Sequence, residues 1–316
     1  PRAGDSPTTP QGAPIPMEFL PPATKPVASA IALALLWAIE GAIPMFEGRE
    51  ARGRHDASNL ALGIGNALLA SLLFAGATLF VTEWAREQSL GLLHWLALPA
   101  AWSVVAAVVL LDLWQYVWHR MNHRIPVLWR FHAVHHADRE LDASSGLRFH
   151  TGEILLSGLA RLAVLPLLGL TIGQVLVYET LVLPVVLFHH SNIRLPSGVD
   201  RSLRWLIVTP WMHWVHHSDY QPETDSNYSS LLSVWDRLFR TFRLRNDPRE
   251  ITLGLDGKRY QNWATLPGML AMPFRRNPTT RRRDYDEAAH GSASDPGENR
   301  GSGPTGPPRS PSNTGG

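Results

Sequence analysis

Histidine is the residue through which this sequence can do chemistry. Eleven of its 14 histidines lie between residues 119 and 217, far more than uniform scatter would place there. His119 and His123 are four residues apart, and the motif His-x-x-His-His occurs twice. The copies are His132, His135 and His136, and then His213, His216 and His217. Residues three or four apart share one face of a helix, so each segment is predicted to project two or three imidazoles in one direction.

These eight side chains are more ligands than one tetrahedral ion uses. His150, in the sequence R-F-H-T-G-E, and the pair His189 and His190 enlarge the pool further. The number of ligands therefore predicts two metal ions. Imidazole sites suit zinc, copper, iron and nickel, and a site next to lipid-embedded helices favours a di-iron centre that uses O2 on an unactivated C–H bond.

Two other classes of protein stay open at this point. A zinc-dependent membrane hydrolase would use its metal to activate water, but such a site needs few ligands and a general base, and these motifs contain no glutamate. A metal-binding or metal-transport membrane protein would place ligands near the bilayer midplane. Here the histidines follow the ends of apolar segments, which favours the oxygen-using enzyme.

The rest of the composition narrows the class further. The 316 residues include no cysteine, which excludes disulfides, thiolate-ligated zinc, iron–sulfur clusters and a cysteine nucleophile. Only 18% of the residues are charged, below the ~25% of a typical soluble domain. Lysine and arginine number 29 against 27 acidic residues, and no nucleic-acid partner is expected.

The apolar segments predict membrane helices. Residues 28–46, 59–83 and 93–118 are each long enough to cross ~30 Å of hydrocarbon. Residues 154–188 are interrupted near Pro166, Gly169 and Gly173, and predict a tight hairpin of either two short passes or a re-entrant pair. The fold class is therefore all-α and integral to the membrane, with about three transmembrane helices plus a helical hairpin, which makes four to five passes.

The distribution of arginine predicts the orientation. Arg49, Arg52 and Arg54 lie in the loop after the first segment, which places that loop in the cytoplasm. The third segment then returns to the cytoplasm near His119, and the hairpin brings the chain back to the same side. Both His-rich segments are thus predicted to meet in a cytosolic helical cap that carries the dimetal site, on what the composition indicates is a bacterial inner membrane.

Three parts of the chain are expected. Residues 1–27 form a disordered N-terminal segment, with Met17 as a plausible true start. Residues 28–273 form the membrane domain, in which residues 191–265 contribute a cap whose tryptophans partly lie at the interface. Residues 274–316 are rich in Arg, Pro, Gly and Ser and form a disordered tail.

A set of motifs between residues 111 and 242 carries a family resemblance. The set comprises H-R-M-N-H, W-R-F-H-A-V-H-H, L-R-F-H-T-G-E, H-S-N-I, H-W-V-H-H and N-Y-S-S-L-L-S-V-W-D-R-L-F-R-T-F. In order and spacing it resembles the sterol desaturase/fatty acid hydroxylase superfamily of membrane-bound, non-haem di-iron oxygenases. One departure is Arg240, which stands where the family usually has glycine after W-D-R-L-F.

The resemblance implies a di-iron centre, O2 as co-substrate and a lipid substrate. The ligands it implies are His119, His123, His132, His135, His136, His150, His190, His213, His216 and His217. Four polar residues are expected to hydrogen bond to ligand imidazoles and fix their tautomers. They are Asp112 and Gln115, which precede His119 on its helical face, and Asp219 and Asn227, which follow the last motif.

The electron donor is expected to be a separate protein of the cytochrome, ferredoxin or reductase type. The sequence shows neither a haem-binding segment with a surplus pair of histidines nor a glycine-rich dinucleotide fingerprint. The histidine motifs do not choose between hydroxylation and desaturation. They also do not choose among sterol, fatty acyl, carotenoid and alkylglycerol substrates, because the substrate meets generic apolar helices.

Overall fold

Five long apolar helices dominate the computed structural model, which describes residues 23–47, 52–255 and 264–275. Each is long and apolar enough to cross a membrane. They are α1 (Thr24–Ala42), α2 (Arg52–Glu87), α4 (Ala100–Arg124), α6 (Thr151–Leu168) and α7 (Ile172–His190). The described residues contain no strand, only isolated bridges. The predicted all-α membrane class is thus confirmed.

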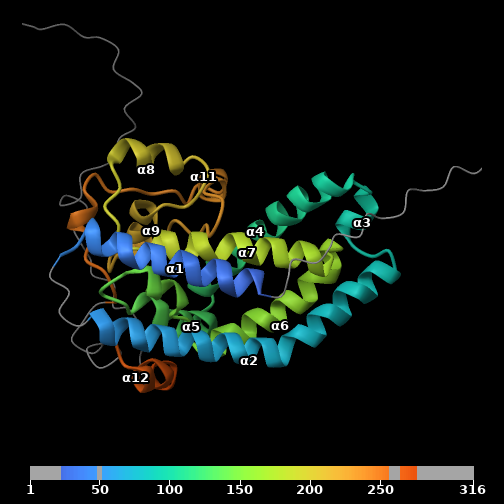
Figure 1. The fold of residues 1–316 in the computed structure, drawn as a ribbon, viewed down its shortest axis with the longest axis horizontal. Coiled ribbons are helices and arrows are strands. Elements are labelled where there is room, and N and C mark those ends of the chain that lie inside the picture. Colours follow the sequence, from blue (N-terminus) through green and yellow to red (C-terminus); the bar gives the residue numbers. More distant parts are fainter. Residues whose placement is uncertain (1–22, 48–51, 256–263, 276–316) are drawn as a thin grey trace, which may run out of the picture. The chain divides into compact units, whose positions relative to one another are not determined.

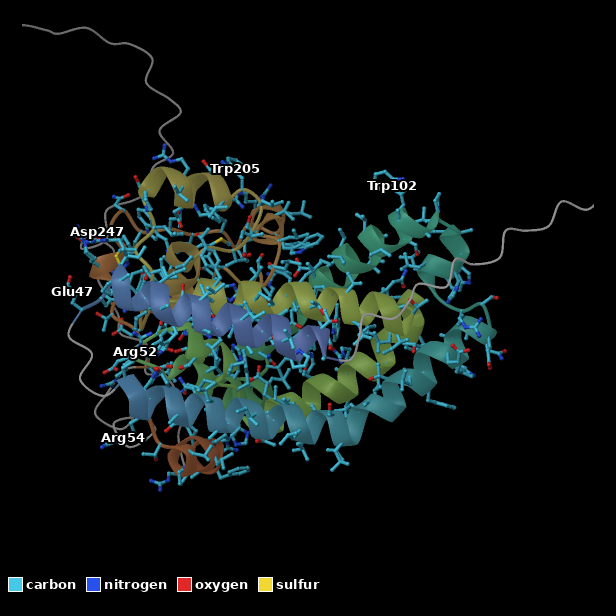
Figure 2. The ribbon with its side chains drawn as sticks, in the orientation of Figure 1. Glu47, Arg52, Arg54, Trp102, Trp205 and Asp247 are labelled. Carbon is cyan, nitrogen blue, oxygen red and sulfur yellow. The ribbon has the colours of Figure 1, made fainter. Side chains whose placement is uncertain are left out.

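The outer surface of these helices is apolar. Leu72 and Phe80 on α2 are 81% and 70% exposed, whereas the polar Asn59 and Asn66 of the same helix are buried. In water this arrangement would leave large apolar side chains without cover, but in a bilayer the lipid tails cover them. Trp95 and Trp102 are both exposed. Figure 2 shows Trp102 at one end of the bundle, where an interfacial aromatic belt is expected.

All three predicted apolar segments differ from the observed helices at their starts. Helix α2 begins at Arg52, upstream of the expected boundary at residue 59. Helix α1 begins at Thr24, upstream of the expected boundary at residue 28. The segment 93–118 is not one helix, because the short helix α3 (Leu92–Leu96) ends at Ala97, whose φ is +46°, and α4 begins only after Pro99. A left-handed residue followed by a pre-proline residue interrupts helical geometry.

The predicted hairpin is two separate helices of 18 and 19 residues. Its break lies at Gly169–Thr171, whereas Pro166 and Gly173 lie inside α6 and α7. Gly169 ends α6 with φ +69°, and a Cβ there would come 2.9 Å from the carbonyl oxygen of Leu90. Thr171 and Gln174 begin α7 with reciprocal side-chain caps. Of the two predicted arrangements, these lengths favour two short passes.

Short helices gather at one end of the long ones and form the cap (Figure 1). They are α5 (Pro126–His136), η1 (Ala143–Leu147), α8 (Ser197–Leu203), α9 (Pro210–His216), α10 (Gln221–Thr224), α11 (Val234–Leu238), η2 (Pro248–Glu250), α12 (Leu266–Ala271) and η4 (Met272–Phe274). Helix α5 contacts α4, and α9 contacts α7. The two His-rich segments therefore meet at one end of the bundle, as the pass count predicts.

The remaining domain predictions concern the chain ends. Residues 1–22, with Met17, and residues 276–316 lie outside the described residues. Helix η4 ends at Phe274, next to the expected end of the membrane domain. All described residues lie within one unit, residues 1–283.

Candidate metal centre

Nine buried or nearly buried histidines form two compact groups. The five-histidine group contains His119 and His123 of α4, His132 and His136 of α5, and His216 of α9. The four-histidine group contains His135 of α5, His190 at the end of α7, and His213 and His217 of α9 and its C-cap. Within each group one ring nitrogen of every histidine lies within 4.8 Å of all the others. This is the spacing that one ion needs.

Each His-x-x-His-His motif serves both groups. His132 and His136 face the five-histidine group, whereas His135 faces the other. The later motif is divided in the opposite sense, with His213 and His217 in the four-histidine group. The expectation that all three rings project together was wrong, because on a helix positions i and i+4 lie about 40° apart while i+3 lies about 100° from i+4.

The ring nitrogens in the five-histidine group have fixed roles. His119 Nδ1 lies 2.8 Å from the carbonyl oxygen of Tyr228, and His216 Nδ1 lies 2.6 Å from that of Ser226. A carbonyl only accepts, so both Nδ1 atoms carry the proton and both Nε2 atoms present lone pairs. Those two Nε2 atoms are nevertheless 3.0 Å apart. Facing lone pairs repel each other unless a cation lies between them.

His132 completes the same arrangement. Its Nδ1 lies 2.9 Å from Glu153 Oε1, and its Nε2 lies 3.1 Å from His119 Nε2. Both ring nitrogens of His123 and the Nε2 of His136 are buried without a hydrogen-bond partner among the described residues. Buried polar atoms rarely stay unpaired. His123 Nδ1 lies 3.5 Å from Asp225 Oδ1, and the Nε2 atoms of His123 and His136 fit the coordination of a metal ion.

The four-histidine group shows the same convergence. His190 Nδ1 donates to the carbonyl oxygen of Val186 at 2.7 Å. His190 Nε2 then lies 3.1 Å from His135 Nε2 and 3.0 Å from His213 Nε2, and His217 Nε2 lies 3.1 Å from His213 Nε2. Metal–nitrogen bonds of about 2.0–2.1 Å place the ligands of one ion roughly 2.9–3.4 Å apart. Both groups therefore fit a metal ion.

The protonation state of the histidines is also the one that metal ligands need. Burial, followed by the neighbouring imidazoles, lowers the pKa of His136, His216 and His217 well below its usual range. The rings are thus neutral, as ligands must be. Neutral imidazole is a ligand for iron, zinc, copper and nickel, and this donor set does not choose among them.

His150 and His189 lie outside both groups. His150 begins α6, where its Nδ1 accepts from the backbone N–H of Gly152 at 2.9 Å and its Nε2 donates to the carbonyl oxygen of Leu270 at 3.2 Å. Both of its ring nitrogens are therefore used in holding the chain. His189 packs its ring 4.0 Å from that of His213, measured between centroids.

The predicted supporting residues have other partners. Asp112 accepts from the backbone N–H groups of Leu231 and Leu232 and from Trp235 Nε1, so it anchors the cap and does not contact an imidazole. The expectation that it bonds a ligand ring was wrong, because seven residues along a helix place it about 10 Å from His119.

Of the other three predicted supports, Asn227 has a different role, whereas for Asp219 and Gln115 the expected contact stays a prediction. Asn227 donates to the carbonyl oxygens of Met212 and Arg243, and so holds the backbone next to His213. The backbone N–H of Asp219 donates to Thr252. For Gln115, which is half-buried, no contact with a ligand histidine is recorded among the described residues.

The supports that are present come from groups that sequence reasoning did not select. Three are the backbone carbonyls of Tyr228, Ser226 and Val186, which carry no residue-type signal. The fourth is Glu153, which accepts from both His132 and Asn122 Nδ2. Glu153 also lies in the first turn of α6, where a carboxylate is favourable.

A third cluster lies beside the site. His55 Nε2 is 2.9 Å from Asp138 Oδ1, and its Nδ1 is 3.1 Å from Asp142 Oδ2. Arg52 lies 3.7 Å from Asp56, and Arg148 lies 3.8 Å from Asp138. Cations thus balance these carboxylates, so the cluster needs no metal. Instead it fixes the loop that leaves α5 directly after His135 and His136.

Comparisons with known proteins match the part of the chain that carries the two histidine groups. Residues 104–241 match the fatty acid hydroxylase family model. The chain is 32% identical over 178 residues to ornithine lipid hydroxylase OlsE of Rhizobium tropici, covering 56% of this chain and 52% of that protein. It is 26% identical over 223 residues to alkylglycerol monooxygenase of Homo sapiens, covering 68% and 45%. It is 25% identical over 171 residues to cholesterol 25-hydroxylase of Homo sapiens, covering 50% and 61%.

The chain therefore spans about half the length of the curated relatives it matches. No solved structure shows a significant similarity to it.

Proposed function

Because residues 104–241 match the fatty acid hydroxylase family model, we propose that the chain is a membrane-bound di-iron monooxygenase that hydroxylates a C–H bond of a lipid. The observation that carries the proposal is the pair of buried all-imidazole groups at one end of five apolar helices. Such a site offers metal chemistry to a molecule that is dissolved in the bilayer. The relatives are named as hydroxylases or monooxygenases of lipids, which favours oxygen insertion over desaturation.

The proposed ligands are the nine histidines of the two groups. Four of them have Nδ1 bonded outward, to Tyr228 O, Glu153, Val186 O and Ser226 O. These bonds fix the tautomer that leaves Nε2 free, orient each ring and raise its basicity. His150 is not among the proposed ligands, because both of its ring nitrogens are engaged elsewhere.

Two iron ions, when bound to these groups, supply the activation of O2 that an unactivated C–H bond requires. The overall reaction consumes the lipid, one O2, two electrons and two protons, and yields the alcohol and one water. The chain's own part is to keep the site dry and fixed. Eight of the nine ligands are buried residues, and the side chain of the ninth, His123, is 0% exposed. Phe149 stacks on the ring of His135 at 4.4 Å between centroids.

Two further parts of the proposal concern the surroundings. The electrons come from a separate donor protein of the cytochrome, ferredoxin or reductase type. The histidine end of the bundle faces the cytoplasm, because Arg52, Arg54, Arg120 and Arg124 lie at that end and cytoplasmic ends are enriched in arginine. From the composition we further propose that the membrane is a bacterial inner membrane.

The test combines metal analysis with turnover. Detergent-purified protein reconstituted anaerobically with iron-57 is expected to hold two irons per chain with the Mössbauer signature of a coupled pair. Given reductant and 18O2, it is expected to add labelled oxygen to a component of a membrane lipid extract. The variant His135→Ala is expected to lose turnover, whereas the control His94→Gln, next to Gly169 at the opposite end of the bundle, is expected to keep it.

One result would overturn the proposal. If zinc persists after iron reconstitution and a product forms equally well without O2, the site is hydrolytic and the family match describes the fold alone.

A further inference from the structure

The cap carries a second feature, an exposed apolar surface that is separate from the metal centre. We call it the wedge and define it by Val199, Trp205, Leu206, Val234, Leu238 and Phe239. Trp205, Leu206 and Leu238 are 71%, 66% and 63% exposed, and Figure 2 shows Trp205 beside α8 at the outer edge of the cap. Single exposed apolar residues are ordinary, but a contiguous group of large ones marks a binding surface.

Backbone hydrogen bonds join the two halves of the wedge. Val208 N–H donates to Leu231 O at 3.1 Å, and Ser233 N–H donates to Leu206 O at 3.2 Å. The guanidinium of Arg237 lies 4.8 Å from the centre of the Trp205 ring. The loop after α8 and helix α11 therefore form one continuous surface, although they are about thirty residues apart in the sequence.

The wedge lies alongside a membrane-spanning helix and not above it. Phe239 stacks on Tyr116 of α4 at 5.1 Å between centroids, and Trp235 Nε1 donates to Asp112 Oδ2 at 2.8 Å. Leu232 packs in the same cluster as Val109. Asp112 and Val109 precede His119 by seven and ten residues, which is about 10 and 15 Å along the helix. Residues 232–239 thus lie along α4, from near the level of the metal ligands towards the middle of that helix.

Charge around the wedge favours a membrane over another apolar protein surface. Residues 197–207 and 233–243 contain five arginines and two aspartates. The aspartates, Asp200 and Asp236, are 1% and 0% exposed, and Arg204 is buried as well, 3.0 Å from Asp200. The outward charge is still positive, because the exposed charged residues of these segments are Arg201, Arg240 and Arg243. Arginines that rim an apolar patch keep their heads in the headgroup layer while their stems cover apolar surface, and they attract anionic lipid.

We propose that the wedge is inserted into the leaflet on the cap side of the bilayer and is held there by anionic phospholipid headgroups. The cap is then a partly embedded element in which α11 and the loop after α8 displace lipid next to α4. This proposal does not depend on the metal or on the reaction, so it stands or fails separately from the proposed function.

The absence of cysteine from the sequence makes a direct test possible. Single variants Leu206→Cys and Leu238→Cys carry a nitroxide spin label on full-length protein in nanodiscs of phosphatidylcholine with phosphatidylglycerol. Leu72→Cys on α2, where Leu72 is 81% exposed, is the lipid reference. Arg249→Cys in the cap, where the side chain is 70% exposed, is the water reference. Collision rates with O2, which concentrates in lipid, and with a water-soluble nickel chelate report the surroundings of each label.

The labels at Leu206 and Leu238 are expected to match the Leu72 label, with O2 favoured over the chelate, and to move towards the chelate when phosphatidylglycerol is left out. Collision rates that match those of the Arg249 label would overturn the proposal. Protection of the labels from both agents would also overturn it, because such protection indicates cover by protein, for example by a second copy of the chain. An unchanged result without phosphatidylglycerol would remove the role of anionic headgroups. Each variant's elution and thermal unfolding confirm its fold, and two independent wedge positions guard against the failure of one.

Discussion

Glu153 gives the sharpest test of how the chain supports its metal ligands. Its Oε1 accepts from His132 Nδ1 at 2.9 Å and from Asn122 Nδ2 at 3.1 Å, and the side chain is buried. His132 belongs to the five-histidine group only. Changing Glu153 is therefore expected to weaken one of the two metal sites and to leave the other unchanged.

The size of the effect follows from the kind of hydrogen bond that is lost. A hydrogen bond to a charged acceptor contributes about 1.5–3 kcal/mol, against about 0.5–1.5 kcal/mol for a neutral pair. Glu153→Gln keeps an acceptor and loses the charge, so it is expected to cost about 1–1.5 kcal/mol, roughly tenfold in affinity. Glu153→Ala leaves the imidazole N–H without a partner, and the loss is expected to reach roughly 10–100-fold.

The assay is competition with a graded chelator, followed by elemental analysis of the protein. One class of metal is expected to weaken in the order wild type, Gln variant, Ala variant, while the second class keeps its affinity. Glu87→Gln, an exposed carboxylate near the far end of α2, is the control and should match wild type. Equal weakening of both classes, or unchanged affinity in Glu153→Ala, would refute the assignment of Glu153 to the five-histidine group.

Three further predictions rest on single features. Asp112→Asn puts an amide NH2 against backbone N–H donors and is expected to destabilise the protein by about 2–3 kcal/mol in thermal unfolding, while metal per folded chain stays unchanged. Arg240 has a φ of +58°, which strains the backbone of a residue other than glycine. Arg240→Gly is therefore expected to stabilise the fold by about 1 kcal/mol and to raise the melting temperature by a few degrees. A lower melting temperature would show that the backbone at Arg240 is not strained. Because burial lowers the pKa of His217 well below 6.5, metal-free protein should be most stable above that pH. Its melting temperature should fall from about pH 8 to about pH 5, since the unfolded chain takes up protons that the buried ring does not.

Nine of the ten histidines selected from the sequence lie in the two groups, whereas His150 does not, and the sequence did not predict how the nine divide between the groups. Spacing of three and four residues places rings near one another, and counting the passes brings both His-x-x-His-His motifs to one end of the bundle. The assignment of His135 to one group and His136 to the other depends on which helices pack on either side of α5. That is a property of tertiary packing, and no single segment contains it.

The supporting contacts were the least predictable part. Asp112 was selected because it shares a helical face with His119, and the face was right, but the rise of the helix separates them by about 10 Å. The acceptors for His119 and His216 are the backbone carbonyls of Tyr228 and Ser226, which any residue type supplies. His55 belongs to no motif, and its partners Asp138 and Asp142 come from a loop more than eighty residues away.

The two groups differ in how firmly their ligands are held. In the five-histidine group, three rings are fixed through Nδ1 by acceptors from other parts of the chain. In the four-histidine group only His190 has such a bond, and its acceptor, Val186, belongs to the same helix. The Nδ1 atoms of His135, His213 and His217 have no hydrogen-bond partner among the described residues. Outer hydrogen bonds of this kind contribute roughly 10–100-fold to affinity.

This asymmetry predicts that the two ions leave separately. The four-histidine group has one ligand fewer and three rings without an outward hydrogen bond, so a chelator of intermediate strength is expected to remove its ion first and to leave one metal per chain. His135→Ala should then bind one metal, with the affinity of the tight class, while His132→Ala should lose the tight class and keep the weak one. Loss of both ions together, or loss of the tight class in His135→Ala, would show that the outward hydrogen bonds do not set the order.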